Sequence, residues 1–139
     1  MSPKLVFRLP TIDEYNRLRR SVEWPEFTHE LVKRALTNTL FSVVAVGDDG
    51  VAVGMGRVIG DNAIYFHIQD VIVRSDWHGA GVGTMMMKEL LAYVDKHSGK
   101  NTNIGLMCSK GREHFYLNFG FVKRPTEKFG SGMIKIVEG

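Results

Sequence analysis

Hydrophobic positions in the first half of the 139-residue chain change their spacing several times, and each change marks an expected element. A short apolar run is followed by two segments with the i, i+3, i+4 spacing of amphipathic helices, and then by three runs rich in β-branched residues. Glycine-containing turns separate these three runs, which predicts antiparallel strands in series. The expected elements are a strand at 5–7, helices at 12–22 and 29–37, and strands at 41–46, 51–59 and 63–73.

Local signals set the ends of the two helices. Thr11 and Glu14 match a capping box, in which each side chain accepts a hydrogen bond from the backbone of the other residue. Pro25 disfavours helical conformation in the residue before it, and Thr28 can cap the next helix. The chain therefore begins strand, helix, helix.

The second half opens with a long helical pattern that follows a glycine-rich turn and should end near Ser98. Beyond it, Ile104, Leu106 and Cys108 alternate along a fifth strand, and 112–119 is typical of a short helix. The residues from 121 on, including an apolar run at 133–137, should supply one or two last strands. The apolar face of the long helix consists of Val82, Met86, Leu90, Tyr93, Val94 and His97.

Composition narrows the class of protein. With 44% hydrophobic residues the chain can bury one core, so we expect a single domain over 1–139. The chain has no apolar run of the roughly 18 residues that span a membrane and no N-terminal secretory signal, so we expect a cytoplasmic protein without a membrane partner. The net charge of +3 comes from interspersed charges, so we expect no nucleic-acid partner. The histidines fall at no metal-binding spacing, and we expect no metal.

The glycine-rich turn carries the most distinctive chemistry. It follows the apolar run Val71–Val73 and reads Gly79-Ala80-Gly81-Val82-Gly83-Thr84 before the long helix. Glycines let the backbone approach a ligand closely, and the first N–H groups of the helix then point toward an anion. The pattern predicts a cradle for a pyrophosphate.

The strand expected before this turn has one residue, Asp70, that does not fit its pattern of apolar positions. On an unbroken strand Asp70 would share one face with Phe66, Ile68 and Ile72, which places a carboxylate in an apolar row. A β-bulge within 69–71 would remove the conflict and would leave an unpaired amide able to polarise a carbonyl.

The turn and the later segment Phe115-Tyr116-Leu117-Asn118-Phe119-Gly120-Phe121 resemble the two signatures of the GNAT superfamily of acetyl-coenzyme A-dependent N-acetyltransferases. The order of expected elements also resembles that family's order over nearly the whole chain. The resemblance implies a GNAT fold of mixed α/β class, with a mostly antiparallel sheet of six to seven strands, a splayed parallel pair of fourth and fifth strands, and four flanking helices.

The resemblance also implies where acetyl-coenzyme A binds. The diphosphate would contact the turn residues His78, Gly79, Ala80, Gly81, Val82, Gly83 and Thr84. The family usually has Arg or Gln where His78 stands, and a neutral imidazole lacks the reach and permanent charge of Arg. The backbone of Val71, Ile72 and Val73 would meet the pantetheine arm and thioester carbonyl. Ser109 stands where relatives often have a coenzyme-binding Asn, and Tyr116 would contact the coenzyme and protonate its leaving thiolate.

Three routes remain open for removing protons from the attacking amine. His67 lies where arylalkylamine-acylating relatives have a histidine, and Gln69 replaces a second one. We rank His67 above Asp70 as the base, with a water chain as the third route. Four residues are expected near the acceptor, although Trp24 and Phe27 also suit core packing and Arg57 also suits a solvated sheet surface. These substrate-binding candidates are Trp24, Phe27, Arg57 and Gln69.

The resemblance implies transfer of an acetyl group from acetyl-coenzyme A to a primary amine of a small molecule, by direct attack through a tetrahedral intermediate. Two alternatives stay open: a protein or peptide N-acetyltransferase, and a non-catalytic acetyl-coenzyme A sensor. Family habit also suggests a homodimer with the C-terminal strands as possible contacts.

Overall fold

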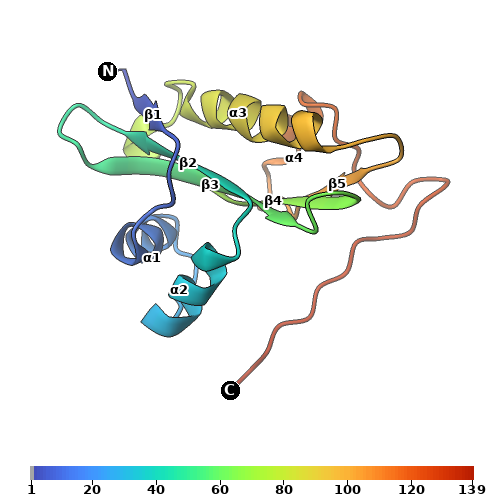
Figure 1. The fold of residues 1–139 in the computed structure, drawn as a ribbon, viewed down its shortest axis with the longest axis horizontal. Coiled ribbons are helices and arrows are strands. Elements are labelled where there is room, and N and C mark those ends of the chain that lie inside the picture. Colours follow the sequence, from blue (N-terminus) through green and yellow to red (C-terminus); the bar gives the residue numbers. More distant parts are fainter. Residues whose placement is uncertain (1) are drawn as a thin grey trace. The chain divides into compact units, whose positions relative to one another are not determined.

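The computed structural model describes residues 2–139 and divides into two units, one ending at Leu106 and the other comprising Met107–Gly139. Figure 1 shows the ribbon of both. The first unit contains β1 (Lys4–Val6), α1 (Ile12–Ser21), α2 (His29–Thr37), β2 (Phe41–Val46), β3 (Ala52–Gly60), β4 (Tyr65–Val73), the 3-10 turn η1 (Ser75–Trp77), α3 (Val82–His97) and β5 (Asn103–Gly105). The second unit contains α4 (Glu113–Leu117).

The strands of the first unit form one mixed sheet in the order β1-β2-β3-β4-β5. The first four strands pair antiparallel, and β5 lies parallel to β4. The β4–β5 ladder runs only from Tyr65, opposite Asn103, to His67, opposite Gly105. Beyond His67 the β5 side of β4 has no paired strand among the described residues, so the expected parting of these two strands begins there.

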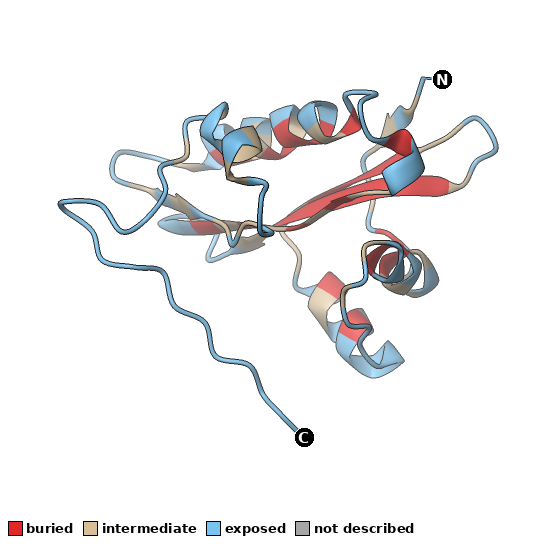
Figure 2. Cartoon of the chain, turned by 180° about the vertical axis from the view of Figure 1, so that it is seen from behind, coloured by how far each residue is buried: buried red, intermediate tan, exposed pale blue. Residues whose placement is uncertain are grey.

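Helices cover both faces of this sheet (Figures 1 and 2). The α1 and α2 helices pack on one face through a buried cluster that includes Tyr15, Leu18 and Met55. The α3 helix packs on the other face, where a Cβ at Gly56 would lie 2.9 Å from Leu90 Cδ1. The absence of a side chain at this glycine lets α3 approach the sheet closely.

The expected capping signals hold at both N-terminal helices. Thr11 Oγ1 accepts from Glu14 N at 3.1 Å, and Thr11 N donates to Glu14 Oε1 at 2.8 Å. Thr28 caps α2 by accepting from Leu31 N. These caps satisfy N–H groups that a helix cannot satisfy internally, which is why the predicted starts are confirmed.

A β-bulge interrupts the β3–β4 ladder where the sequence predicts one. Met55 pairs with Ile72 and Arg57 with Gln69, so Asp70 and Val71 together oppose the single residue between Met55 and Arg57. Asp70 adopts a φ of +56°, which is uncommon outside glycine and is accommodated here by the bulge. The extra residue shifts the alternation, so the carboxylate leaves the face of Phe66 and Ile68 and points to the α1 side of the sheet, where Ile72 also packs.

The predicted number of strands is wrong, because the sheet has five strands rather than six or seven. The fifth strand ends at Gly105, so Cys108 lies outside it, and no strand forms within 121–139 of the described chain. The apolar residues Met133 and Val137 are 88% and 93% exposed. Alternating sequence favours an extended segment, but a strand also needs a partner ladder, which this tail does not have within its own unit.

Candidate active site

The glycine turn before α3 presents main-chain N–H groups. Gly79 and Gly81 have φ values of +84° and +79°, and a Cβ at either would contact no atom within 4 Å. Gly81 is the N-cap of α3 and provides no side-chain cap. Within residues 2–139, the N–H groups of Val82, Gly83 and Thr84 donate to no backbone acceptor. This set of donors at a helix N-terminus fits the diphosphate of acetyl-coenzyme A.

His78 is directed away from that role. Its Nε2 lies 2.8 Å from the carbonyl oxygen of Val73, the last residue of β4. Since a carbonyl only accepts, Nε2 carries the hydrogen, and Nδ1 of the neutral ring is an acceptor. With its N–H engaged by Val73 O, the imidazole has no further N–H group to donate to a phosphate. Its observed contact instead ties the turn to the end of the strand.

The turn is also anchored at its start. Trp77 is 6% exposed, and its ring lies beside Gly47 in the β2–β3 turn. Arg74 donates its backbone N–H to Val53 O at 2.8 Å, and its guanidinium pairs with Asp76 at 2.7 Å. These contacts fix the path by which the chain leaves β4 and enters the turn.

Two β4 candidates share a sheet face with Arg57. The pairs Arg57–Gln69 and Ile59–His67 are two residues apart on both strands, so His67, Gln69 and Arg57 point to the same side. Burial lowers the pKa of His67 below its ordinary 6.5 and outweighs the opposing influence of the Gln69 side chain. His67 is therefore neutral near pH 7, as a general base must be.

Asp70 sits in a buried polar cluster on the α1 side. Its Oδ1 accepts from Arg19 Nη1 at 3.0 Å, and its Oδ2 accepts from Arg57 Nε at 2.9 Å and Tyr15 Oη at 2.7 Å. Burial, followed by the charge of Asp70, raises the pKa of Tyr15 to about 12, so this phenol remains a donor. To act as a general base, Asp70 would have to release its hydrogen bonds to these donors. This cost makes His67 the better candidate for the base.

Arg19 also organises the segment between α1 and α2. Its guanidinium carbon lies 5.3 Å from the ring centroid of Trp24 and 4.6 Å from that of Phe27, and Nε donates to Pro25 O at 2.6 Å. These are cation–π distances. Trp24 thus supports a buried arginine and packs against the core. Core packing was one of the two roles expected for it, the other being a contact with the acceptor.

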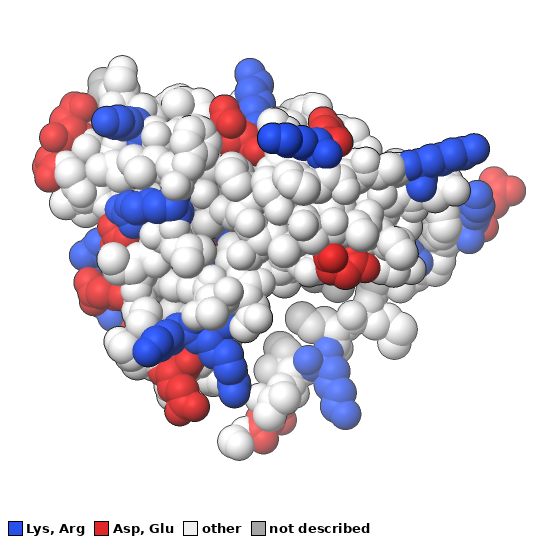
Figure 3. All heavy atoms as spheres, viewed as in Figure 1, with Lys and Arg blue, Asp and Glu red and all other residues white. Residues whose placement is uncertain are grey.

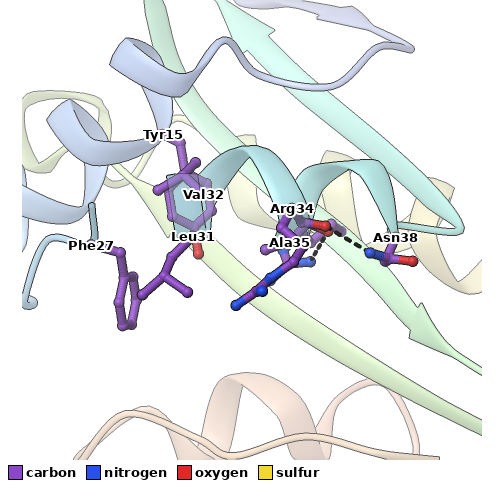
Figure 4. A pocket seen from close by; sticks show the side chains of 8 residues that line it. Tyr15, Phe27, Leu31, Val32, Arg34, Ala35 and Asn38 are labelled. Atoms are coloured by element: carbon purple, nitrogen blue, oxygen red, sulfur yellow. Dashed lines mark hydrogen bonds between the residues drawn. The ribbon is translucent and has the colours of Figure 1, made fainter. Parts of the chain in front are cut away.

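A pocket of about 460 Å³ lies beside this cluster, between α1, α2 and β3. Two of the four expected substrate-binding residues line it, Phe27 and Arg57; Trp24 and Gln69 do not. In Figure 4, Phe27 and Leu31 lie toward one end of the pocket and Asn38 toward the other, with Arg34 between them. The lining also includes Tyr15, Leu31, Arg34 and Asn38, which the sequence did not indicate as substrate-binding residues.

The second unit holds the other two candidates. Tyr116 lies in α4 and packs edge-on against Phe115 and Phe121, with ring centroids 5.0 and 6.2 Å away. Burial raises the pKa of Tyr116, which keeps its phenol protonated, as a general acid requires. Ser109 is exposed, and its carbonyl accepts from Arg112 N.

Among residues 2–139, no group of three or more His, Cys, Asp or Glu side chains is placed to hold a metal ion. No helix of the described chain combines the length and apolar character needed to cross a bilayer.

The family model of the acetyltransferase (GNAT) domain matches residues 15–137. The chain belongs to the GNAT family. The GNAT match includes both the glycine turn and the Tyr116 segment, so the resemblance inferred from these two motifs is confirmed at the level of the family.

Relatives of known sequence agree with this assignment. The chain is 29% identical over 115 residues to the uncharacterised N-acetyltransferase ycf52 of Porphyra purpurea, a match that covers 81% of this chain and 65% of that protein. It is 32% identical over 118 residues to a ycf52-like N-acetyltransferase of Prochlorococcus marinus, covering 81% and 63%. The GNAT chain thus matches slightly less than two thirds of the length of these relatives.

Solved structures show the same architecture. A protein of unknown function from meticillin-resistant Staphylococcus aureus has a TM-score of 0.88 and 30% identity, with 98% of this chain and 100% of that chain covered. A GNAT-family acetyltransferase from Streptococcus pneumoniae has a TM-score of 0.81 and 26% identity, with 99% and 100% covered. The GNAT fold assignment therefore holds for almost the whole chain.

Proposed function

We propose that this GNAT protein is an acetyl-coenzyme A-dependent N-acetyltransferase whose acceptor is a primary amine of a small molecule. The observation that carries the proposal is the row of N–H groups at the start of α3 that find no backbone acceptor within residues 2–139, behind two glycines with positive φ. Such a row binds a diphosphate through the main chain and through the dipole of the helix.

The chain's own groups account for binding and proton transfer. Bound acetyl-coenzyme A supplies the acetyl group as a thioester. The amides of the glycine turn hold the diphosphate, and the edge of β4 beyond His67 offers Val71–Val73 to the arm and to the thioester carbonyl. Donors aimed at a carbonyl stabilise the negative charge that develops on its oxygen during attack.

Two side chains manage the protons. His67, neutral because burial lowers its pKa, accepts a proton from the attacking amine. Tyr116, protonated because burial raises its pKa, donates to the departing thiolate. The acetyl carbon exchanges its bond to sulfur for a bond to nitrogen, and the products are an acetamide and free coenzyme A.

The size of the pocket favours a small acceptor. A volume of about 460 Å³ falls within the range typical of small-molecule sites, roughly 300–1,000 Å³. A peptide acceptor would instead require an extended groove, so protein N-acetylation is the second candidate. A non-catalytic sensor transfers no protons, so it would not need His67 as a neutral proton acceptor on the sheet face that also carries Arg57.

A thiol-release assay with acetyl-coenzyme A and a panel of amines tests this proposal. We expect turnover with at least one small amine, and Tyr116→Phe should lower kcat by about 10²-fold or more because it removes the proton donor. The affinity for acetyl-coenzyme A should change little. Phe115→Leu, which alters the same α4 packing without removing a hydroxyl, is the matched control. Unchanged turnover in Tyr116→Phe would remove this residue from the mechanism.

A further inference from the structure

The pocket beside Asp70 is positively charged. Two arginines, Arg34 and Arg57, line it, and its lining includes no acidic side chain. On the face drawn in Figure 3, by contrast, acidic and basic side chains are interspersed. The composition of this pocket is therefore a local feature and does not follow from the chain's small net charge.

The charges next to the pocket do not balance. Arg19 and Arg57 are 8% and 9% exposed, and both bind the single carboxylate of Asp70, which is 4% exposed. Two buried guanidinium groups therefore share one buried negative charge. Excess charge removed from water is unfavourable unless a partner compensates it, so a second anion would be stabilised here.

Arg57 retains a donor for such an anion. Its Nε binds Asp70 Oδ2, and its Nη1 donates to Thr39 Oγ1 at 3.1 Å. Its Nη2 donates to no atom within residues 2–139, although every fully buried side-chain N or O there has a hydrogen-bond partner. The Nη2 group is therefore accessible, and Arg57 lines the pocket.

Arg34 supplies a second cation. It is exposed in the last turn of α2 and forms no ion pair with any acidic side chain of the described residues. Its position near the helix C-terminus is favourable for a positive charge. The same position also places it in the lining with Phe27 and Leu31, so cationic and apolar groups lie around one space (Figure 4).

We propose that this pocket selects an acceptor amine that carries an anionic group, a carboxylate or a phosphate, together with an apolar body. The anion would accept from Arg57 Nη2 and from the Arg34 guanidinium, and the apolar body would lie against Phe27 and Leu31. Polycationic amines are disfavoured because they would meet two arginines and no lining carboxylate. This inference rests on the proposed function for its amine, but the anion preference concerns the pocket itself.

Equilibrium binding of three unreactive probes tests the preference without turnover. The probes are 3-phenylpropionate, phenyl phosphate and the neutral 3-phenylpropanamide, titrated into the full chain by calorimetry. We expect at least one anion to bind about tenfold or more tightly than the amide, because a charged acceptor strengthens hydrogen bonds to guanidinium groups. The ratio between the two anions distinguishes a carboxylate from a phosphate ligand.

Matched variants assign the effect to the pocket. Arg34→Gln should reduce the anion preference severalfold, and Arg34→Lys should retain most of it. Lys33→Gln removes the same charge from a neighbouring exposed position outside the lining and should leave the ratio unchanged. Equal affinity for all three probes, tighter binding of the amide, no measurable binding, or equal losses in Arg34→Gln and Lys33→Gln would overturn the inference.

The thiol-release assay separates this inference from the proposed function. Phenylalanine with phenethylamine, and phosphoethanolamine with ethanolamine, are acceptor pairs that differ in the anionic group. Preferred acetylation of the anionic member supports both claims. Turnover that favours the cationic member rejects only the anion selectivity, and absence of turnover with retained anion binding rejects only the enzyme.

Discussion

The glycine turn and the Asp70 cluster lie in one unit, but the first is formed by main-chain groups and the second by side chains. The turn uses main-chain groups within a few consecutive residues, and the side chain at its first position, His78, contacts the strand. The Asp70 cluster uses side chains that lie 13, 51 and 55 residues from Asp70 in the sequence. Main-chain binding suits a ligand shared by a whole family, whereas side-chain clusters can diverge with the acceptor.

Removing the carboxylate of the Asp70 cluster should lower the free energy of unfolding strongly. Asp70→Asn leaves Arg19 and Arg57 buried without a counter-charge, and breaking a buried ion pair in this way typically costs about 3–5 kcal/mol. We expect a loss of that order in the free energy of unfolding, measured by urea denaturation. Asp76→Asn removes a carboxylate from an exposed pair and should lower the free energy of unfolding far less than Asp70→Asn does. Similar losses in the two variants would contradict a structural role for Asp70.

The contrast also explains what the sequence could reveal. The bulge was predictable because a carboxylate in an apolar row is a local contradiction, and the caps at Thr11 and Thr28 are local signals. The partners of Asp70 were not identified, because Tyr15 and Arg19 precede it by more than 50 residues. One signal was available: Arg19 lies four residues after Tyr15, on the buried face of α1, and a buried cation needs a partner.

The C-terminal segment shows what the sequence could not predict. The run at Met133–Val137 has an apolar pattern typical of a strand, yet it forms none within the second unit. A periodic pattern indicates which side chains could share a face, but it does not specify the strand that would complete the ladder. The number of strands was therefore the least predictable part of the fold.

A second prediction concerns the base on the same sheet face. His67→Gln should lower kcat/KM by about 10²-fold, because it removes a positioned proton acceptor. Burial lowers the pKa of His67, so the wild-type rate should persist to below pH 6.5 before it falls. Titration of the amine affects the wild type and the variant equally, so it cancels in the ratio of their rates. This wild-type-to-variant ratio should decrease as the pH is lowered through that acidic range. A ratio independent of pH would exclude His67 as the base.

The same shift affects stability with a defined sign. The unfolded chain takes up a proton at His67 more readily than the native chain, so lowering the pH through 6.5 favours unfolding. This contribution to the free energy of unfolding is present above pH 6.5 and is lost as the pH falls through the lower pKa of the native state. It should be missing in His67→Gln.

The smallest predicted effect is at the glycine turn. Gly81→Ala places a Cβ on a residue with a φ of +79°, a conformation that costs an L-residue roughly 1–2 kcal/mol. We expect the affinity for acetyl-coenzyme A, measured by calorimetry, to weaken by about tenfold. Binding of 3-phenylpropionate at the acceptor pocket should be unaffected. Gly99→Ala, at a glycine without positive φ, is the control and should bind the coenzyme normally.

The most direct test of the account is to follow the backbone amides by nuclear magnetic resonance while acetyl-coenzyme A is added. If the main chain holds the diphosphate, the amide signals of Gly79–Thr84 should show the largest changes in the first unit, with smaller changes along Val71–Val73. Saturable binding that leaves the amides of 79–84 unmoved, or no binding at millimolar coenzyme, would contradict the assignment of this turn as the diphosphate site.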